Sequence, residues 1–294
     1  MSIAGVVLSI RSQGRAWRFP SKSTYGRFLT VDGGQAVDAS IRAHWGPALL
    51  DDFGEQIFSA QTPEDTAPVL RLYRRGSQRI AWVRMSTSDI RTNRIGIFDR
   101  DFRSGDVYVE LLAEPQDRYP YPLSFPLDRV LLLNLLGLGR GLMMHASGIA
   151  HQGRGLLFTG PSGAGKSTLA RLWSDHPGTT VLGDECLIVR RVGGQYRVYG
   201  TPWTGPDSVA SPGGVPLQAI FFIDHASDNA ASPRQEVSAV EGLLARAFST
   251  FYDREAMQYT LDFCAHLGQS VPAYDLGFTP TPDIVRFVQD MDPS

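Results

Sequence analysis

The chain has 294 residues, enough for one large domain or two modest ones. Hydrophobic residues make up 43% of it and charged residues 20%, which is ordinary for a soluble globular protein. The formal net charge is -2, so the chain has no overall basic field that would attract nucleic acid. We therefore expect no nucleic-acid partner.

The sequence shows no signal for export or membrane insertion. Residues 1–7 lack the cationic start of a secretory signal peptide. The most apolar stretch, residues 130–138, is too short to span a bilayer and is interrupted by Asn134, so we interpret it as a buried helix. The two cysteines, Cys186 and Cys264, have different local settings, and we expect two buried free thiols. These features predict a cytoplasmic protein without a membrane partner.

The first part of the chain, residues 1–123, consists mostly of predicted strands. Alternating apolar and polar residues predict one hairpin from residues 69–73 and 79–85 across Arg75-Gly76-Ser77, and a second from residues 95–98 and 107–112 across residues 101–105. Further strands are expected at residues 6–10, 28–31 and 41–45. A segment rich in proline and tyrosine, residues 115–126, ends this mostly antiparallel region, and we place a domain boundary between residues 123 and 124.

The second part, residues 124–294, alternates predicted helices and strands, as in an α/β domain. The expected strands are residues 141–149, 155–159, 179–182, 187–191, 196–199, 217–223 and 271–278. Two of them form a hairpin across Gly193-Gly194. The expected helices are residues 127–138, 237–248, 253–267 with Asp253 as its N-cap, and a last one that Thr281 caps and Pro282 begins.

Residues 160–167 read GPSGAGKS, which matches the phosphate-binding pattern G-x-x-x-x-G-K-[ST]. A predicted strand precedes it and a predicted helix follows, which is the context that the pattern requires. The glycines let the backbone turn tightly, and the inward N–H groups and the helix N-terminus attract phosphate oxygens. Lys166 can reach the β- and γ-phosphates and the Ser167 hydroxyl can ligate Mg²⁺. The residues expected to bind nucleotide are Gly160, Pro161, Ser162, Gly163, Ala164, Gly165, Lys166, Ser167 and Thr168.

Two acids, Asp184 and Glu185, follow the predicted strand 179–182. Ligands of open α/β sheets gather at the carboxyl ends of strands. One carboxylate can hold Mg²⁺ or its water shell while the other accepts the proton of an incoming hydroxyl. Successive side chains of a strand point to opposite faces, so both acids face the metal only if the chain turns, and Gly183 favours such a turn. An acid-rich turn without a metal is the alternative.

Other residues have both a structural and a functional interpretation. His145, on the strand before the loop strand, is either a core histidine or a group beside the nucleotide. In the segment 200–205, Thr201 and Trp203 either pack inside or contact substrate. Two arginines could stabilise transition-state charge or solvate a helix face, and they are Arg246 and Arg254.

The order of His145-Ala146-Ser147-Gly148, the glycine loop 160–168 and Gly183-Asp184-Glu185 resembles the C-terminal catalytic domain of HPr kinase/phosphorylase. It resembles more closely the HPr-kinase-related bacterial kinases, including those that phosphorylate lasso-peptide precursors. The resemblance covers residues 127–290 and implies a nucleotide-binding core similar to that of phosphoenolpyruvate carboxykinase. The predicted fold is thus an α/β P-loop catalytic domain of this type, preceded by a β-rich, mostly antiparallel N-terminal region.

Carried over from the family, Asp184 is the catalytic acid–base, His145 lies beside the reacting phosphate and Lys166 holds the triphosphate. The implied metal ligands are Ser167, Asp184 and Glu185. The chain departs from the family in two ways: the glycine-rich signature downstream of the acids is not recognisable, and the N-terminal region is unlike that of HPr kinases. The related enzymes assemble as oligomers, which leaves a homo-oligomer open here.

Two functions fit these features. The first is a kinase that uses ATP and Mg²⁺ to phosphorylate a hydroxyl, either a serine of a peptide or protein or a small alcohol, with residues 1–123 recognising the acceptor. The second is a nucleotide-gated ATPase or binding module whose N-terminal domain engages a protein or peptide partner. The adjacent Asp184 and Glu185 resemble the acid pair of ATPases and keep the second function open.

Overall fold

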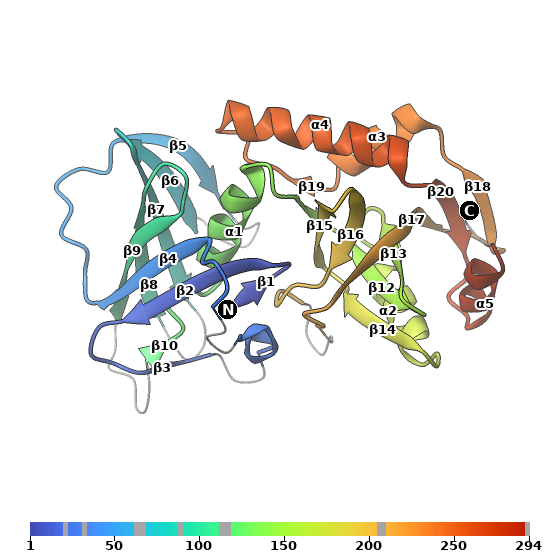
Figure 1. Cartoon of the computed structure of the whole chain (residues 1–294), viewed down its shortest axis with the longest axis horizontal. Coiled ribbons are helices and arrows are strands. Elements are labelled where there is room, and N and C mark those ends of the chain that lie inside the picture. Colours follow the sequence, from blue (N-terminus) through green and yellow to red (C-terminus); the bar gives the residue numbers. More distant parts are fainter. Residues whose placement is uncertain are drawn as a thin grey trace. The chain divides into compact units, whose positions relative to one another are not determined.

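The computed structural model describes residues 1–19, 23–30, 34–61, 69–86, 91–111, 119–204 and 210–291. The chain divides into two units, Met1–Leu138 and Gly139–Ser294, and each contains both strands and helix (Figure 1). The predicted α/β class is therefore confirmed. Within the described part of the chain, no helix combines the length and the apolar character that crossing a bilayer requires.

The first unit is built around an eight-stranded sheet in the order β1-β2-β4-β9-β8-β7-β6-β5. Its strands are β1 (Ser2–Ile3), β2 (Val6–Ser12), β4 (Ala39–Trp45), β5 (Glu55–Ala60), β6 (Leu70–Arg75), β7 (Gln78–Ser86), β8 (Arg91–Phe98) and β9 (Ser104–Leu111). Neighbouring strands are antiparallel, except that β4 runs parallel to both β2 and β9. Two short strands, β3 (Trp17–Arg18) and β10 (Tyr119–Pro120), form a separate parallel pair.

Both predicted hairpins of the first unit are present, as β6 with β7 and as β8 with β9. The strand expected at residues 28–31 is wrong, because Phe28 ends a 3-10 helix, η1 (Tyr25–Phe28). The Phe28 side chain is buried, so its apolar character reflects packing of a turn and not a strand. Some predicted positions lie outside the described residues, and these are Val31, Leu112, residues 115–118 and Gly205.

Helix α1 (Leu127–Gly137) belongs to the first unit. Its buried Leu127 lies over β8, where a Cβ on Gly96 would come 3.4 Å from Leu127 Cδ1. Its buried Asp128 accepts a hydrogen bond from the Tyr25 hydroxyl. The division between the units therefore falls after α1 and not between residues 123 and 124, because the helix completes the core of the strand-rich part.

The second unit contains a ten-stranded sheet that includes three adjacent parallel strands, β13, β17 and β20. Its strands are β11 (Leu142–His145), β12 (Ser147–His151), β13 (Arg154–Thr159), β14 (Thr179–Gly183), β15 (Cys186–Val192), β16 (Gln195–Tyr199), β17 (Gly214–His225), β18 (Ala230–Pro233), β19 (Ala247–Phe248) and β20 (Ala273–Phe278). Its helices are α2 (Lys166–Ser174), α3 (Glu236–Leu244), α4 (Arg254–Ser270) and α5 (Asp283–Asp290).

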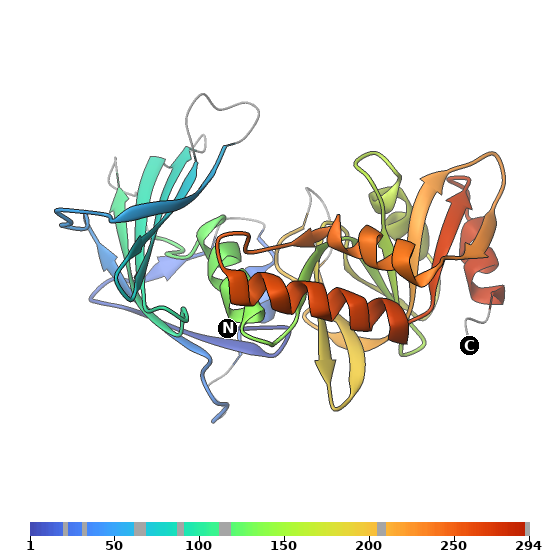
Figure 2. The same cartoon turned by 90° about the horizontal axis from the view of Figure 1, so that it is seen from above.

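Helices cover both faces of this sheet (Figure 2). On β17, Phe221 and Ile223 pack with α2 and α5, whereas Ile220 packs with α3 and α4 on the other face. This alternation follows from the two-residue period of a strand, and it leaves both faces of the central strands buried. Cys186 and Cys264 are free and buried, as the sequence predicts.

The single strand expected at residues 141–149 is two strands, β11 and β12, which are separated at Ala146. Before this residue the chain pairs with β15, and after it the chain pairs with β13 and β14. The Ala146 N–H donates to Glu185 O (3.3 Å) at the change of partner. The sequence gives no signal for this break, because apolar residues continue through it.

Helix ends also differ from the expected ones. The helix predicted for residues 237–248 ends at Leu244, and residues 247–248 form β19 beside β11. Pro282 occupies the N-cap position of α5, and Thr281 does not cap it. The Asp253 cap of α4 is confirmed, since its carboxylate accepts the Ala256 N–H at 3.0 Å. The hairpin across Gly193-Gly194 is confirmed as β15 with β16.

Gly200 is predicted to be essential for the stability of the second unit. A Cβ at this position would lie 2.1 Å from Ser211 O and 2.3 Å from Leu182 O, and these backbone atoms cannot give way like a flexible side chain. Gly200→Ala should lower the free energy of unfolding by about 3 kcal/mol in urea titrations. Gly213→Ala is the matched control, because its Cβ meets only Ser211 Oγ at 3.4 Å, and it should change stability by less than about 0.5 kcal/mol. Equal stability of the two variants would contradict this packing.

Candidate functional site

Several strand ends of the second unit meet at one edge of its sheet. The strands β13, β17 and β20 are parallel, and β14 runs the same way as β13 because both are antiparallel to β12. The loop 160–165 follows β13, and Asp184 and Glu185 follow β14. His145 ends β11 opposite Cys186. The structure thus brings the glycine loop, the acids and the histidine to the same edge.

The backbone of the loop has the shape that its glycines permit. Gly163 has a φ of 83° and Gly165 a φ of 94°, both in the left-handed region. Helix α2 begins directly after Gly165, and in the described residues no side chain caps its first turn. The N–H groups of that turn are therefore available to a bound anion, which the helix dipole also favours.

Lys166 points back into the loop. Its Nζ donates to Gly160 O at 3.0 Å and to Pro161 O at 2.9 Å, and the residue is 7% exposed. Burial lowers the pKa of Lys166, and the charge of Arg246 lowers this pKa further. The sequence has only two lysines, Lys22 and Lys166, so a compact ammonium is used here in a chain whose other cations are almost all arginines. Ser167 beside it is exposed and Thr168 is half-buried.

His145 is half-buried and fixed by hydrogen bonds. Its Nδ1 lies 2.9 Å from Glu185 O, so Nδ1 carries the proton and Nε2 is the acceptor in the neutral ring. Its backbone carbonyl accepts from Thr159 Oγ1 (3.1 Å) at the end of β13. Burial lowers the pKa of His145, and the charge of Lys166 is the next cause, which shows that the histidine is near the loop lysine.

The acid pair lies in a bend between β14 and β15, and both acids are half-buried. Their carbonyls face the start of β12: Asp184 O accepts from Ser147 Oγ at 3.3 Å, and Glu185 O accepts from Ala146 N and from His145. The expected turn at this point is therefore present. Backbone hydrogen bonds fix the position of the acids relative to His145, so the edge of the sheet is a rigid support for their side chains.

The remaining candidate residues differ in whether they are buried in the core, lie near the glycine loop or are exposed. Thr201 is fully buried and donates from Oγ1 to Cys186 O at 2.6 Å, and Trp203 is 4% exposed, so both pack inside, which is the structural one of their two interpretations. Arg246 is at the site, since its carbonyl accepts the His145 N–H (2.8 Å) and its charge lowers the pKa of Lys166. Arg254 is exposed at the start of α4.

The sequence analysis missed His225, the last residue of β17. Its Nε2 donates to Gly163 O at 2.8 Å, and its ring stacks on Phe278 with the centroids 5.8 Å apart. It therefore connects the tip of the loop to two neighbouring strands. The sequence does contain a signal for His225, because this polar residue closely follows the apolar run 217–223. A strand that runs parallel to β13 and lies next to it ends at the same edge of the sheet as the glycine loop.

Residues 130–277, half of the chain, match the family described as SynChlorMet cassette protein ScmC, and the chain belongs to this family. No curated protein matches the chain significantly. Among solved structures, the Hpr(Ser) kinase/phosphatase from Coxiella burnetii is similar at 13% identity, with a TM-score of 0.32, over 51% of this chain and 97% of that one. A likeness at this TM-score supports no conclusion, so the relation to HPr kinases stays a prediction.

The contact between His225 and the loop predicts a measurable effect on loop dynamics. His225→Phe keeps an aromatic ring against Phe278 but removes the hydrogen bond to Gly163 O, which is worth about 1 kcal/mol. Amide hydrogen exchange of residues 160–165 should become about fivefold faster, as measured by mass spectrometry. His266→Phe, on the exposed side of α4, is the control and should leave this exchange unchanged. Equal exchange in wild type and His225→Phe would contradict the assigned support.

Proposed function

We propose that this protein binds ATP with Mg²⁺ at the loop after β13 and transfers the γ-phosphoryl group to a hydroxyl. The observation that carries this proposal is the combination of β13, the left-handed glycine loop and α2 beginning at Lys166, with Asp184 following β14 at the same sheet edge. This combination supports the proposal because a helix N-terminus, which favours anions, lies at the same edge as a cation and an acid.

The residues present fit a magnesium nucleotide. The uncapped first turn of α2 and Lys166 suit the phosphates, and Ser167, Asp184 and Glu185 are the oxygen donors that would hold Mg²⁺. The metal neutralises phosphate charge when it is bound. Lys166 supplies a positive charge to the transferring group, and on ligand binding its ammonium exchanges two loop carbonyls for phosphate oxygens.

In this proposal Asp184 accepts the proton of the acceptor hydroxyl, and His145 lies beside the reacting phosphate with Nε2 available. Arg246 adds positive charge at the same site, and this charge lowers the pKa of both Lys166 and His145. Buried cations stabilise the charge of a transferring phosphoryl group without reorganisation of solvent.

We further propose a serine of a peptide or protein, or a small alcohol, as the acceptor, and acceptor recognition as the role of the first unit. The alternative is a nucleotide-gated ATPase or binding module. Incubation with γ-labelled ATP, a serine-containing peptide array and a panel of small alcohols distinguishes the two. Label in an acceptor supports the kinase, whereas release of free phosphate without any labelled acceptor supports the ATPase.

Lys166→Ala should weaken ATP binding about a hundredfold in calorimetry, because a charge-assisted hydrogen bond to phosphate is worth about 1.5–3 kcal/mol. Arg171→Ala, on the exposed side of the same helix, should bind ATP like the wild type. An acyl-phosphate derivative of ATP should acylate Lys166, with the Lys22 peptide as the internal reference and excess MgATP as the competitor. Unchanged affinity in Lys166→Ala would overturn the site assignment.

Asp184→Asn should lower turnover by about 10²–10⁴-fold, since general-base catalysis contributes that much. Affinity for ATP should stay within a few-fold, because a base acts mainly in the transition state. Glu185→Gln is the paired variant, and its main effect should be a higher Mg²⁺ requirement. If Asp184→Asn keeps its turnover and loses only Mg²⁺ affinity, the roles of the two acids are exchanged.

A further inference from the structure

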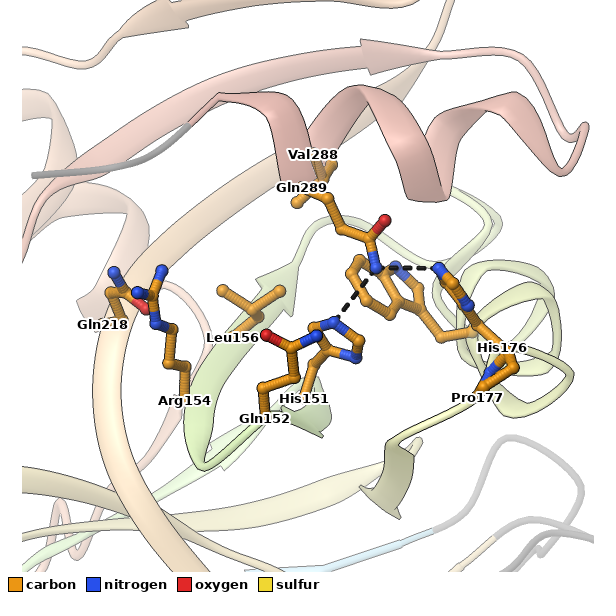
Figure 3. A pocket seen from close by; sticks show the side chains of 10 residues that line it. His151, Gln152, Arg154, Leu156, His176, Pro177, Gln218, Val288 and Gln289 are labelled. Atoms are coloured by element: carbon orange, nitrogen blue, oxygen red, sulfur yellow. Dashed lines mark hydrogen bonds between the residues drawn. The ribbon is translucent and has the colours of Figure 1, made fainter.

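Two histidines and one glutamine meet at the edge of the second sheet that lies opposite to the glycine loop (Figure 3). His151 ends β12 beside the start of β13, His176 follows the end of α2, and Gln289 lies in the last turn of α5. All three line a pocket of about 440 Å³. The described lining of this pocket includes no residue of the glycine loop or of the acid pair, so the group is separate from the proposed nucleotide site.

The Gln289 amide connects the two imidazole rings. Its nitrogen lies 3.1 Å from His151 Nε2 and 2.8 Å from His176 Nε2, and Figure 3 shows it between the rings. An amide nitrogen is only a donor, so both Nε2 atoms accept and direct their lone pairs at the same point. Two imidazole lone pairs directed at one point are also what a metal ion requires of its first two protein ligands.

The spacing of the polar atoms agrees with a metal site. With metal–nitrogen bonds of about 2.0–2.1 Å, neighbouring ligand atoms of one ion lie about 2.8–3.4 Å apart. Both separations from the Gln289 nitrogen fall in this range. A half-turn of the amide places Oε1 at the corner that the nitrogen now occupies. The group then offers two imidazole nitrogens and one amide oxygen, and water completes the coordination.

His151 is also fixed from its other side. Its Nδ1 lies 3.0 Å from Thr179 Oγ1, so Nδ1 donates its proton to this hydroxyl and Nε2 stays the acceptor. Histidines that bind metal use their second nitrogen in the same way. The side chains of His151, His176 and Gln289 are half-buried. They are therefore held in place before an ion binds and remain within reach of solvent.

The ligand set determines the kind of metal and limits the affinity. Imidazole suits zinc, copper and nickel ions, whereas Mg²⁺ prefers oxygen ligands. The described residues contain no metal-binding group of three or more His, Cys, Asp or Glu side chains, so only the two imidazoles are strong ligands here. Burial and the charge of His176 lower the pKa of His151, and Arg154 lowers it further, so the Arg154 charge also opposes a cation. We therefore expect a Kd on the order of 10 μM, far weaker than a four-ligand structural zinc site.

We propose that His151, His176 and Gln289 bind a divalent transition-metal ion that prefers imidazole, such as Zn²⁺. The ion joins the end of β12, the chain after α2 and helix α5, which are connected here by the hydrogen bonds of one amide. This inference does not depend on the proposed function, because the nucleotide site uses Mg²⁺ and oxygen ligands at the other edge of the sheet.

Calorimetry of the full-length protein with ZnCl₂, in the presence of excess MgCl₂, tests the site. His176→Gln should weaken Zn²⁺ binding at least about tenfold, because it removes one of the two imidazole ligands. His266→Gln is the matched control, since His266 is exposed on α4, and it should bind Zn²⁺ like the wild type. Gln289→His replaces the weak amide ligand by a third imidazole and should tighten binding about tenfold, a gain that loss of folding cannot produce.

Hydrogen exchange shows whether Zn²⁺ binds here or at the acid pair. Opening of α5 breaks the proposed site, so Zn²⁺ at about ten times its Kd should slow amide exchange of residues 283–290 about tenfold. His176→Gln should lose this protection, and Mg²⁺ should give none. Four results would each overturn the proposal: no Zn²⁺ binding at about 1 mM, unchanged affinity in His176→Gln, no tightening in Gln289→His, or exchange in α5 that Zn²⁺ does not slow.

Discussion

The second unit depends on one constraint, which is that the turn between β13 and α2 passes very close to the ends of the neighbouring strands β17 and β20. A Cβ on Gly160 would lie 2.7 Å from Ile223 O, and a Cβ on Gly165 would lie 2.7 Å from Phe278 Cζ. Because β17 and β20 supply these neighbours, the parallel pairing of the strands and the shape of the loop require each other. The same closeness lets His225 at the end of β17 reach a loop carbonyl. The packing of these strands and the shape of the loop are thus set by one arrangement.

Positive charge is concentrated at this edge at a cost in desolvation. Lys166 is buried, Arg246 is near enough to lower its pKa, and His145 has a lowered pKa for the same reasons. Two loop carbonyls accept hydrogen bonds from the lysine ammonium. A polyanion bound here, as we propose for ATP, would replace these carbonyl contacts by full negative charges and would offset the cost of burying the cation.

Local patterns predicted much of this structure, and long-range contacts account for the rest. The hairpins and the Asp253 cap depend on residues close in sequence, and these predictions were confirmed. The placement of α1, the buried state of Thr201 and the role of His225 depend on partners far along the chain. The position of Arg246 beside Lys166 and His145 has no local motif either, because contacts between elements far apart in the sequence determine it.

The break at Ala146 restricts how the chain can change in evolution. Met144 and Ala146 face the same core cluster and Ile149 faces the opposite one, so the two-residue alternation continues across the change of pairing partner. One inserted or deleted residue here would turn either β11 or β12 inside out and would displace His145 from the acid turn. Length variation in this family should therefore be excluded from residues 145–147 and should collect at solvent-facing turns such as Gly193-Gly194, where no core side chain changes face.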